Sequence, residues 1–252
     1  MRFYRLLIAI SLLAVSASAQ DPLKTLPKAY KLQFENEWVK VVRVHYEPRE
    51  KLPAHAHTET AAAYVYLNDG GPVLFNHIDQ VYGPVTRQPT KAGSFRLYHA
   101  VQELHEVENK SDLPSDFLRV EFKTEPLNPR SLYGRFYREQ YPAGENFQKV
   151  QFQNEQIRIT RLVCAPGKKL DVSTSPGEPT LLIALTPTQL KVNKSARINL
   201  DLGQSRWVDL NKQEQLENTG NSPAEILRFD FKTKPLSKEM LEKLKKHEHP
   251  KG

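Results

Sequence analysis

The chain repeats part of its own sequence, and this duplication limits what it can fold into. Residues 33–67 align without a gap on residues 151–185, at a spacing of 118 residues. A second block, residues 108–127, recurs as residues 217–236 at a spacing of 109 residues. Solenoid proteins repeat units of about 20–50 residues, so two copies this far apart predict two related domains instead.

The two copies differ at residues that can bind a metal. The first copy holds His55-Ala56-His57, and the second holds Ser173-Thr174-Ser175 at the same positions. A further histidine of the first copy, His105, corresponds to Glu214 in the second. We therefore expect a metal site in the first domain and none in the second.

The N-terminus has the pattern of a secretory signal peptide. Arg2 and Arg5 precede an apolar run over residues 6–15, and Ala17-Ser18-Ala19 follows as a small-residue cleavage site. We expect residues 1–19 to be removed and the protein to be exported to the periplasm or the cell exterior. The alternative is a membrane anchor, but a transmembrane helix needs about 20 apolar residues and the run over residues 6–15 is shorter. We therefore expect no stable membrane insertion after cleavage.

Charge and cysteine content exclude two classes of protein. The net charge of +7 is spread along the chain, apart from a basic tail, and such a distribution does not indicate nucleic-acid binding. Cys164 is the only cysteine, so no disulfide can form within the chain. It lies in an apolar strand pattern, and we expect it to be buried.

Short alternating segments separated by turn residues predict an all-β protein. Residues 39–46 place Val39, Val41 and Arg43 on one face of a strand, with Lys40, Val42, Val44 and Tyr46 on the other. Strands this short and this frequent are typical of a barrel or a sandwich.

Five segments follow from these patterns. Residues 1–19 are the signal peptide, 30–129 the first domain, 130–146 a connector, 147–237 the second domain, and 238–252 a basic tail with a short helix that Ser237 caps. Four aromatic residues make the connector a poor flexible linker. We expect it to pack across the two domains and to hold them as one rigid unit.

The histidines suggest one chemistry. Side chains at i and i+2 of a strand share a face, so His55 and His57 present two imidazoles side by side. His105 starts the pattern His105-Glu106-Val107-Glu108-Asn109, with Asn109 as a turn-forming residue. Three imidazoles suit a divalent ion of iron, manganese, nickel, copper or zinc. The alternative is a lobe whose histidines only bond polar neighbours.

These two motifs resemble those of the cupin superfamily. The first cupin motif has His-x-His, a glutamate after three or four intervening residues, and a glycine; residues 48–70 follow it around His55 and His57. The second has a glycine followed later by His-x-x-x-Asn, as in residues 93–109. The resemblance covers both copies and implies a bicupin, with two jelly-roll β-barrel domains and His55, His57 and His105 as metal ligands.

The sequence departs from the cupin pattern at the glutamate. That residue would fall at Ala61 or Ala62, and neither side chain can bind a metal. Glu59 shares a strand face with His57 and is a further candidate ligand, although it lies closer than the pattern requires. Without it, the site is three histidines with open positions for water or substrate.

Besides a purely structural or partner-binding module, two functions remain open from the sequence. One is an exported bicupin with one mononuclear metal site, for which the resemblance implies small-molecule dioxygenation, isomerisation or decarboxylation. The other is a non-catalytic cupin that binds a sugar or an organic acid without metal. Both take a small-molecule ligand, and both are compatible with a monomer or a homodimer.

Tyr64 and Tyr66 share a strand face, so both point into the pocket or both away from it. His99 lies near the second motif and is within reach of the pocket.

Overall fold

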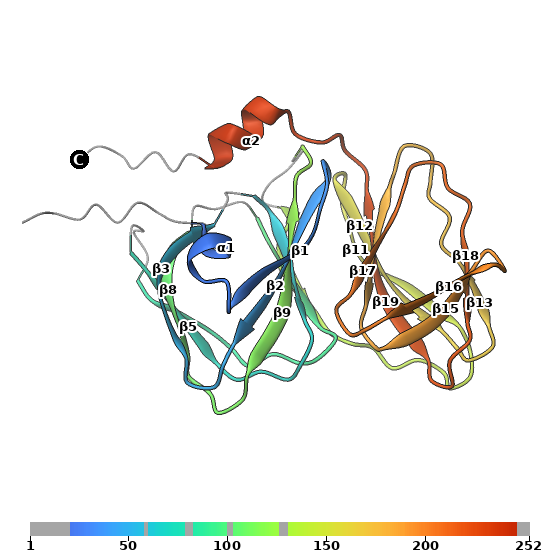
Figure 1. Ribbon diagram of the computed structural model, residues 1–252, viewed down its shortest axis with the longest axis horizontal. Helices are drawn as coiled ribbons and strands as arrows, with labels where there is room; N and C mark the ends of the chain where they lie inside the picture. Colours follow the sequence, from blue (N-terminus) through green and yellow to red (C-terminus); the bar gives the residue numbers. More distant parts are fainter. Residues whose placement is uncertain (1–20, 58–59, 79–82, 100–102, 126–130, 246–252) are drawn as a thin grey trace, which may run out of the picture.

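A computed structural model describes residues 21–57, 60–78, 83–99, 103–125 and 131–245. Two lobes lie side by side along the long axis of the molecule (Figure 1). We call them lobe 1, which holds β1 to β10, and lobe 2, which holds β11 to β19. The prediction of an all-β chain is confirmed, since the described residues contain only two short helices, α1 (Pro22–Thr25) and α2 (Lys238–Lys245). Neither helix is long and apolar enough to cross a membrane. The predicted signal peptide lies outside the described residues.

Lobe 1 consists of a large and a small antiparallel sheet packed face to face. The large sheet has the order β1-β2-β9-β4-β7-β10, and the small sheet has the order β3-β8-β5-β6. The strands are β1 (Tyr30–Glu35), β2 (Val39–Tyr46), β3 (Lys51–His57), β4 (Ala62–Tyr66), β5 (Val73–His77), β6 (Val85–Arg87), β7 (Phe95–Tyr98), β8 (Glu103–Asn109), β9 (Ser115–Phe122) and β10 (Gly134–Phe136).

Lobe 2 repeats this arrangement. Its sheets have the orders β11-β12-β19-β14-β17 and β13-β18-β15-β16, which match lobe 1 strand for strand except for β10. The strands are β11 (Phe147–Gln153), β12 (Ile157–Cys164), β13 (Lys169–Asp171), β14 (Thr180–Ala184), β15 (Thr188–Val192), β16 (Ala196–Leu200), β17 (Ser205–Val208), β18 (Gln215–Asn218) and β19 (Ala224–Phe231). Even the bulge that separates Leu32 from Phe34 recurs between Val150 and Phe152.

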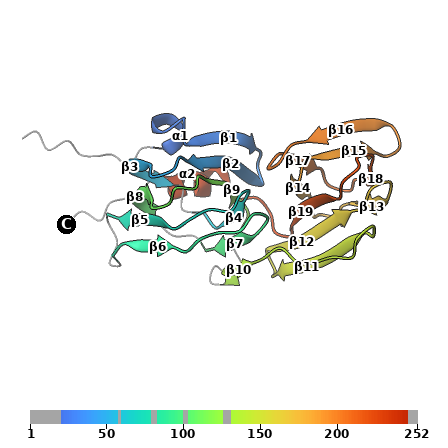
Figure 2. The same cartoon turned by 90° about the horizontal axis from the view of Figure 1, so that it is seen from below.

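The large sheets of the two lobes face each other at the centre of the molecule, and the small sheets lie at its ends (Figure 2). One apolar core therefore spans both lobes, with Val39 and Val41 of β2 packed in the same cluster as Ile157 and Phe229. Val42, Val44 and Tyr46, on the opposite face of β2, belong to a second cluster between the sheets of lobe 1. We call that space the lobe 1 interior.

Repeated arginines join the lobes. Arg43 donates to the backbone carbonyl of Leu202 at 3.4 Å, and its counterpart Arg161 donates to that of Gly93 at 2.5 Å. Each arginine thus reaches the turn before the corresponding strand of the other lobe. Gly93 and Gly203 occupy these turns with φ of 74° and 81°, a conformation that glycine adopts without steric cost.

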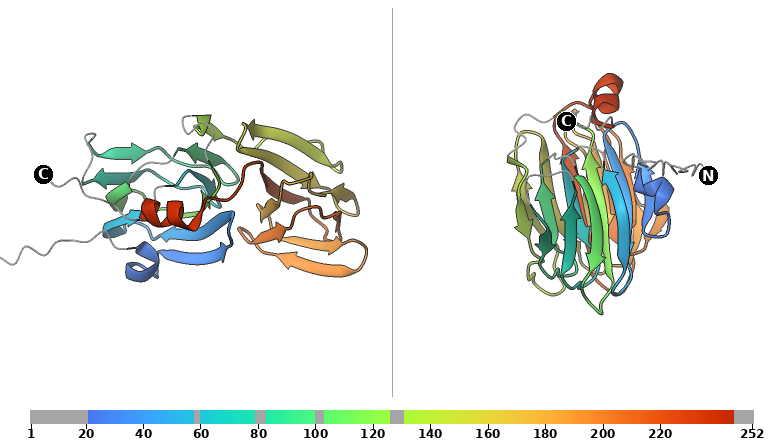
Figure 3. Two further views of the ribbon diagram at one scale, coloured as in Figure 1. Left: turned by 90° about the horizontal axis from the view of Figure 1, so that it is seen from above. Right: turned by 90° about the vertical axis from the view of Figure 1, so that its left-hand side faces the viewer.

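The chain between the lobes contacts both of them. Phe136 of β10 stacks on Phe95 of lobe 1 at 4.6 Å between ring centroids and meets Phe152 of lobe 2 at 5.8 Å. Leu132 is buried in the shared core, whereas Tyr133 and Tyr137 are exposed, so only part of this aromatic segment packs inward. After β19 the chain turns back toward lobe 1, where α2 lies (Figure 3). Ser237 caps α2 by accepting from the backbone N–H of Met240 at 3.2 Å.

Candidate metal centre

The small sheet of lobe 1 brings the predicted histidines together. His55 of β3 is the register partner of His105 of β8, and His57 lies two residues further along β3 on the same face. All three imidazoles are buried in the lobe 1 interior. Their candidate ligand atoms lie within 4.8 Å of one another, and the ring centroids are 4.9–5.3 Å apart.

A bulge in β3 places these side chains. Leu52 pairs with Val107 and His55 with His105, so the register shifts across Pro53 and Ala54. Without this shift, residues 52 and 55 would point to opposite faces, because strand side chains alternate. With it, Leu52 and both histidines of β3 enter the lobe 1 interior.

The hydrogen bonds of His55 fix which ring nitrogen can bind a metal. Nδ1 lies 2.9 Å from the backbone carbonyl of Pro53, which only accepts, so Nδ1 carries the proton. Nε2 therefore presents a lone pair, as a metal ligand must. The hydroxyl of Tyr30 lies 2.8 Å from this Nε2 and donates to it.

The surroundings keep His57 neutral. Its pKa is held well below the ordinary histidine value, first by burial and then by the positive charge of Arg119. A neutral imidazole can bind a metal without losing a proton first. Two nitrogens at about 2.1 Å from one metal lie at most about 4.2 Å apart, so small side-chain adjustments bring the three histidines to bonding distance. The residues present therefore fit a single divalent metal ion.

A cavity of about 490 Å³ opens beside the histidines, with His57 and His105 in its wall. This volume is within the range of small-molecule sites. Phe75, Tyr64 and Tyr98 add aromatic walls, and three arginines, Arg87, Arg96 and Arg119, add positive charge.

Arg87 is the most unusual of these side chains. It is 4% exposed, and its guanidinium carbon lies 5.2 Å from the ring centroid of Tyr66 and 5.3 Å from that of Phe117. One Nη donates to the Ser115 hydroxyl at 2.7 Å, whereas Nε has no hydrogen-bond partner among the described residues. Burial lowers the pKa of this guanidinium, and the groups that raise it are tyrosines rather than carboxylates.

The cupin glutamate has no direct replacement at its expected position. Ala62 faces the lobe 1 interior, whereas Ala61 packs in the core between the lobes. Glu121, the cross-strand partner of Ala62, is buried, but its carboxylate binds Arg119 at 2.9 Å and lies 3.8 Å from Lys40. The candidate ligand Glu59 lies outside the described residues.

Solved structures share this architecture. AerE from Microcystis aeruginosa matches 81% of this chain and 97% of its own, with a TM-score of 0.56 at 12% identity. Oxalate decarboxylase from Lactobacillus farciminis, solved as a formate complex, matches 82% of this chain and 81% of its own, with a TM-score of 0.55 at 13% identity. A variant of salicylate 1,2-dioxygenase from Pseudoaminobacter salicylatoxidans matches 77% and 72%, with a TM-score of 0.51 at 15% identity.

The fold is that of cupin structures such as the cupin 2 conserved barrel domain protein from Leptotrichia buccalis, which matches 80% of this chain and 88% of its own, with a TM-score of 0.50 at 12% identity. The prediction of two tandem jelly-roll lobes is confirmed for the fold. No family model matches the sequence, and no curated protein is similar to it.

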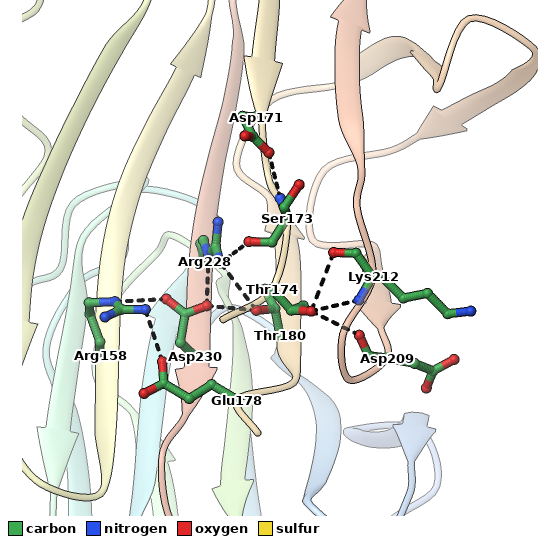
Figure 4. A network of polar contacts seen from close by, with 10 residues as sticks. All are labelled: Arg158, Asp171, Ser173, Thr174, Glu178, Thr180, Asp209, Lys212, Arg228 and Asp230. Atoms are coloured by element: carbon green, nitrogen blue, oxygen red, sulfur yellow. Dashed lines mark hydrogen bonds and ion pairs between the residues drawn. The ribbon is translucent and has the colours of Figure 1, made fainter. Parts of the chain in front are cut away.

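In lobe 2, ion pairs that correspond to those of Arg119, Glu121 and Lys40 in lobe 1 lie beside the serine counterparts of the histidines (Figure 4). Arg228 donates to Asp230 at 2.7 Å and to the carbonyl of Ser173, the counterpart of His55, at 3.0 Å. Arg158 reaches the other oxygen of Asp230 at 3.0 Å. Residues 172–175 follow the end of β13 as a loop. Among the described residues, only the histidines of lobe 1 form a group suited to a metal.

Other residues flagged in the sequence divide between the lobe 1 interior and the remaining structure. Tyr64 lines the cavity and Tyr66 is buried beside it, so both point inward. His99 reaches the cavity and stacks on Tyr98 at 4.7 Å. Asn109 is structural: its Nδ2 donates to the carbonyls of Glu47 and Leu113, both at 2.9 Å.

Sequence reasoning missed Tyr30, His77 and the three arginines. His77 is the register partner of His105, at 5.6 Å between ring centroids, and also lines the cavity. The available signal was alternation: Arg96 stands between Phe95 and Leu97, and Arg119 between Leu118 and Val120. That pattern shows that the arginines share the opposite face from the apolar residues, but not that this face lines a cavity.

Proposed function

We propose that this bicupin is an exported protein that holds one divalent ion of iron, manganese, nickel, copper or zinc on His55, His57 and His105, and that it acts on a small organic acid. The observation that carries the proposal is the meeting of three buried imidazoles, two of them in the wall of a cavity large enough for a small molecule. The tautomer of His55 and the lowered pKa of His57 support it, because both leave a nitrogen lone pair for the metal.

The arginines favour an organic acid over a sugar. A guanidinium binds a carboxylate through charge-assisted hydrogen bonds, which are about twice as strong as neutral ones. Arg87 is buried among aromatic rings, and its Nε–H has no hydrogen-bond partner among the described residues. Arg96 and Arg119 line the same cavity. A carboxylate bound here would replace the solvation that burial has removed from the Arg87 guanidinium.

The site and its structural neighbours support three kinds of reaction. A metal of this kind supplies Lewis-acid polarisation of a substrate oxygen or activation of O₂. The chain's own residues would orient the acid through the arginines and exclude water with the rings of Phe75, Tyr64 and Tyr98. Oxalate and salicylate, named in two neighbours, are both carboxylic acids. Dioxygenation, isomerisation and decarboxylation of such an acid are therefore the reactions to assay.

Metal content tests the first half of the proposal. We expect near one equivalent of metal in the purified protein and its loss in the double variant His55→Ala/His57→Ala, with far-UV circular dichroism showing that both are folded. An absence of metal from the folded parent after reconstitution would leave the rival, a cupin that binds its ligand without metal.

A matched pair of probes tests the ligand class. Salicylate and salicylamide have nearly the same shape, but only salicylate carries a negative charge at neutral pH. We expect salicylate to raise the melting temperature of the parent, and to raise it less in Arg87→Gln. Equal effects of the two probes, or stabilisation by a neutral sugar instead, would contradict an organic-acid site.

A further inference from the structure

Tyr30 stands where a metal on His55 would bind. The lone pair of His55 Nε2 is the one available for coordination, because Nδ1 keeps its proton and donates it in a hydrogen bond to the carbonyl of Pro53. That lone pair now accepts the Tyr30 hydroxyl at 2.8 Å. A metal on Nε2 would lie between the ring and this hydroxyl, so the phenol oxygen must shift sideways, either to an adjacent coordination position on the metal or away from it.

We propose that the Tyr30 oxygen is a fourth protein ligand of the metal held by His55, His57 and His105. This inference rests on the proposed metal site and assigns Tyr30 the role that the cupin pattern gives to a glutamate. Two ligand atoms at about 2.1 Å from one octahedral metal lie about 3.0 Å apart when adjacent, close to the observed separation of the oxygen and Nε2.

The packing of Tyr30 favours coordination over displacement. The side chain is 2% exposed, and its ring lies 5.1 Å from that of His55 and 5.5 Å from that of His57. Its hydroxyl also lies 2.9 Å from the hydroxyl of Tyr46, a second hydrogen-bond partner besides His55. Its backbone N–H bonds the carbonyl of Leu26, just after α1. A side chain fixed at both ends has little room to leave.

Lobe 2 lacks this tyrosine together with the histidines. The register of β1 on β2 pairs Tyr30 with Val44, and the same register in lobe 2 pairs Gln148 with Leu162. Gln148 is exposed. The lobe with three imidazoles thus also has a buried phenol against one of them, and the lobe without imidazoles has neither.

Copper(II) is a suitable probe, because a tyrosine phenolate bound to it, formed as the hydroxyl releases its proton to the buffer, gives a ligand-to-metal charge-transfer band in the visible range. We expect this band in the parent loaded with one equivalent of Cu²⁺, and tyrosine ring modes in its resonance Raman spectrum. Tyr30→Phe should lose the band and bind Cu²⁺ roughly tenfold more weakly or worse, while the histidines still hold it. Tyr46→Phe is the matched control, since it removes the same atom one hydrogen bond further out, and should keep the band.

The outcomes separate this inference from the metal site itself. Stoichiometric copper without the band in the parent, or a band that persists in folded Tyr30→Phe, would show that Tyr30 is not a ligand while the histidine site stands. A parent that binds no copper would overturn both proposals. Copper bound without the band in the parent would overturn the inference even if Tyr30→Phe does not fold, and a band that Tyr46→Phe retains would then point to Tyr30.

Discussion

The carboxylate of Glu214 binds Arg206, with one Nη at 2.8 and 2.7 Å from its two oxygens. These residues occupy the places in lobe 2 that His105 and Arg96 occupy in lobe 1, because Arg206 pairs with Leu182 as Arg96 pairs with Tyr64. Lobe 2 therefore shows that an arginine at this position of β7 or β17 can reach a carboxylate beside the small sheet.

This pairing predicts opposite effects for two equivalent substitutions. Arg96→Gln should weaken salicylate binding roughly tenfold, since a hydrogen bond to a charged group contributes about 1.5–3 kcal/mol, with a small change in stability. Arg206→Gln should lower the free energy of unfolding and leave salicylate affinity unchanged. Isothermal titration and urea unfolding of both variants provide the check; equal losses of affinity would contradict the assignment of the ligand to lobe 1.

A fully buried ion pair lies at the shared interface. Arg161 and Glu225 are both buried, and Arg138 lies 2.6 Å from the second oxygen of Glu225. Glu225→Gln leaves the Arg161 charge buried without a full counter-charge. We expect the free energy of unfolding to fall by about 3–5 kcal/mol, as measured by urea denaturation.

The duplication supplies the control for that substitution. Arg43 and Asp116 occupy the same positions in lobe 1, at 2.6 Å, but their side chains are 37% and 18% exposed. Because water compensates the charges there, Asp116→Asn should cost about 1 kcal/mol or less. A cost as large as that of Glu225→Gln would show that burial does not set the difference.

His57 predicts how stability depends on pH in the metal-free protein. Its pKa in the folded state lies well below the unfolded value, first because of burial. Below about pH 6.5 the unfolded chain takes up a proton at this residue that the native state does not, so stability is lost as the pH falls and is fully present above that value. Unfolding free energies between about pH 6 and 5 should fall more steeply in the parent than in His57→Asn, by up to about 1.4 kcal/mol per pH unit. Parallel curves would contradict the prediction.

Cys164 should be inert in the native protein. Burial raises the pKa of its thiol, and its Sγ donates to the carbonyl of Lys168 at 3.2 Å. Both effects disfavour the reactive thiolate. A colorimetric thiol reagent at mildly alkaline pH should therefore label one thiol per chain in urea and none without it. Rapid labelling of the native protein would show that β12 opens to solvent.

The fold was largely predictable because the alternation of apolar and polar residues within each strand is a local pattern and because the sequence repeats it in two copies. Alternation in residues 39–46 correctly separated the two faces of β2, and both faces are buried, one between the lobes and one within lobe 1. Pattern alone does not show which face meets water. The exposure of Tyr133 and Tyr137 beside buried Leu132 was not predictable either, since it depends on where the connector leaves the sheet.

The candidate site was predictable only where its residues are close in sequence or match a motif. His55 and His57 are adjacent on one strand, and the motif added His105. Tyr30 of β1 and Arg87 of β6 reach the lobe 1 interior from strands far from the histidines in sequence. Their positions depend on the register of those strands, which no local pattern in the sequence shows. Such residues belong to no motif, so they become visible only in three dimensions.

The arginine contacts between the lobes run from equivalent residues to equivalent turns, in both directions. A surface that fits a rotated copy of itself is the signature of a symmetric homodimer. This chain is thus built as a dimer whose subunits have been joined end to end. Once the two halves are joined in one chain, their sequences can change independently. One lobe can then lose its histidines through mutation and still provide the interface that the other lobe needs.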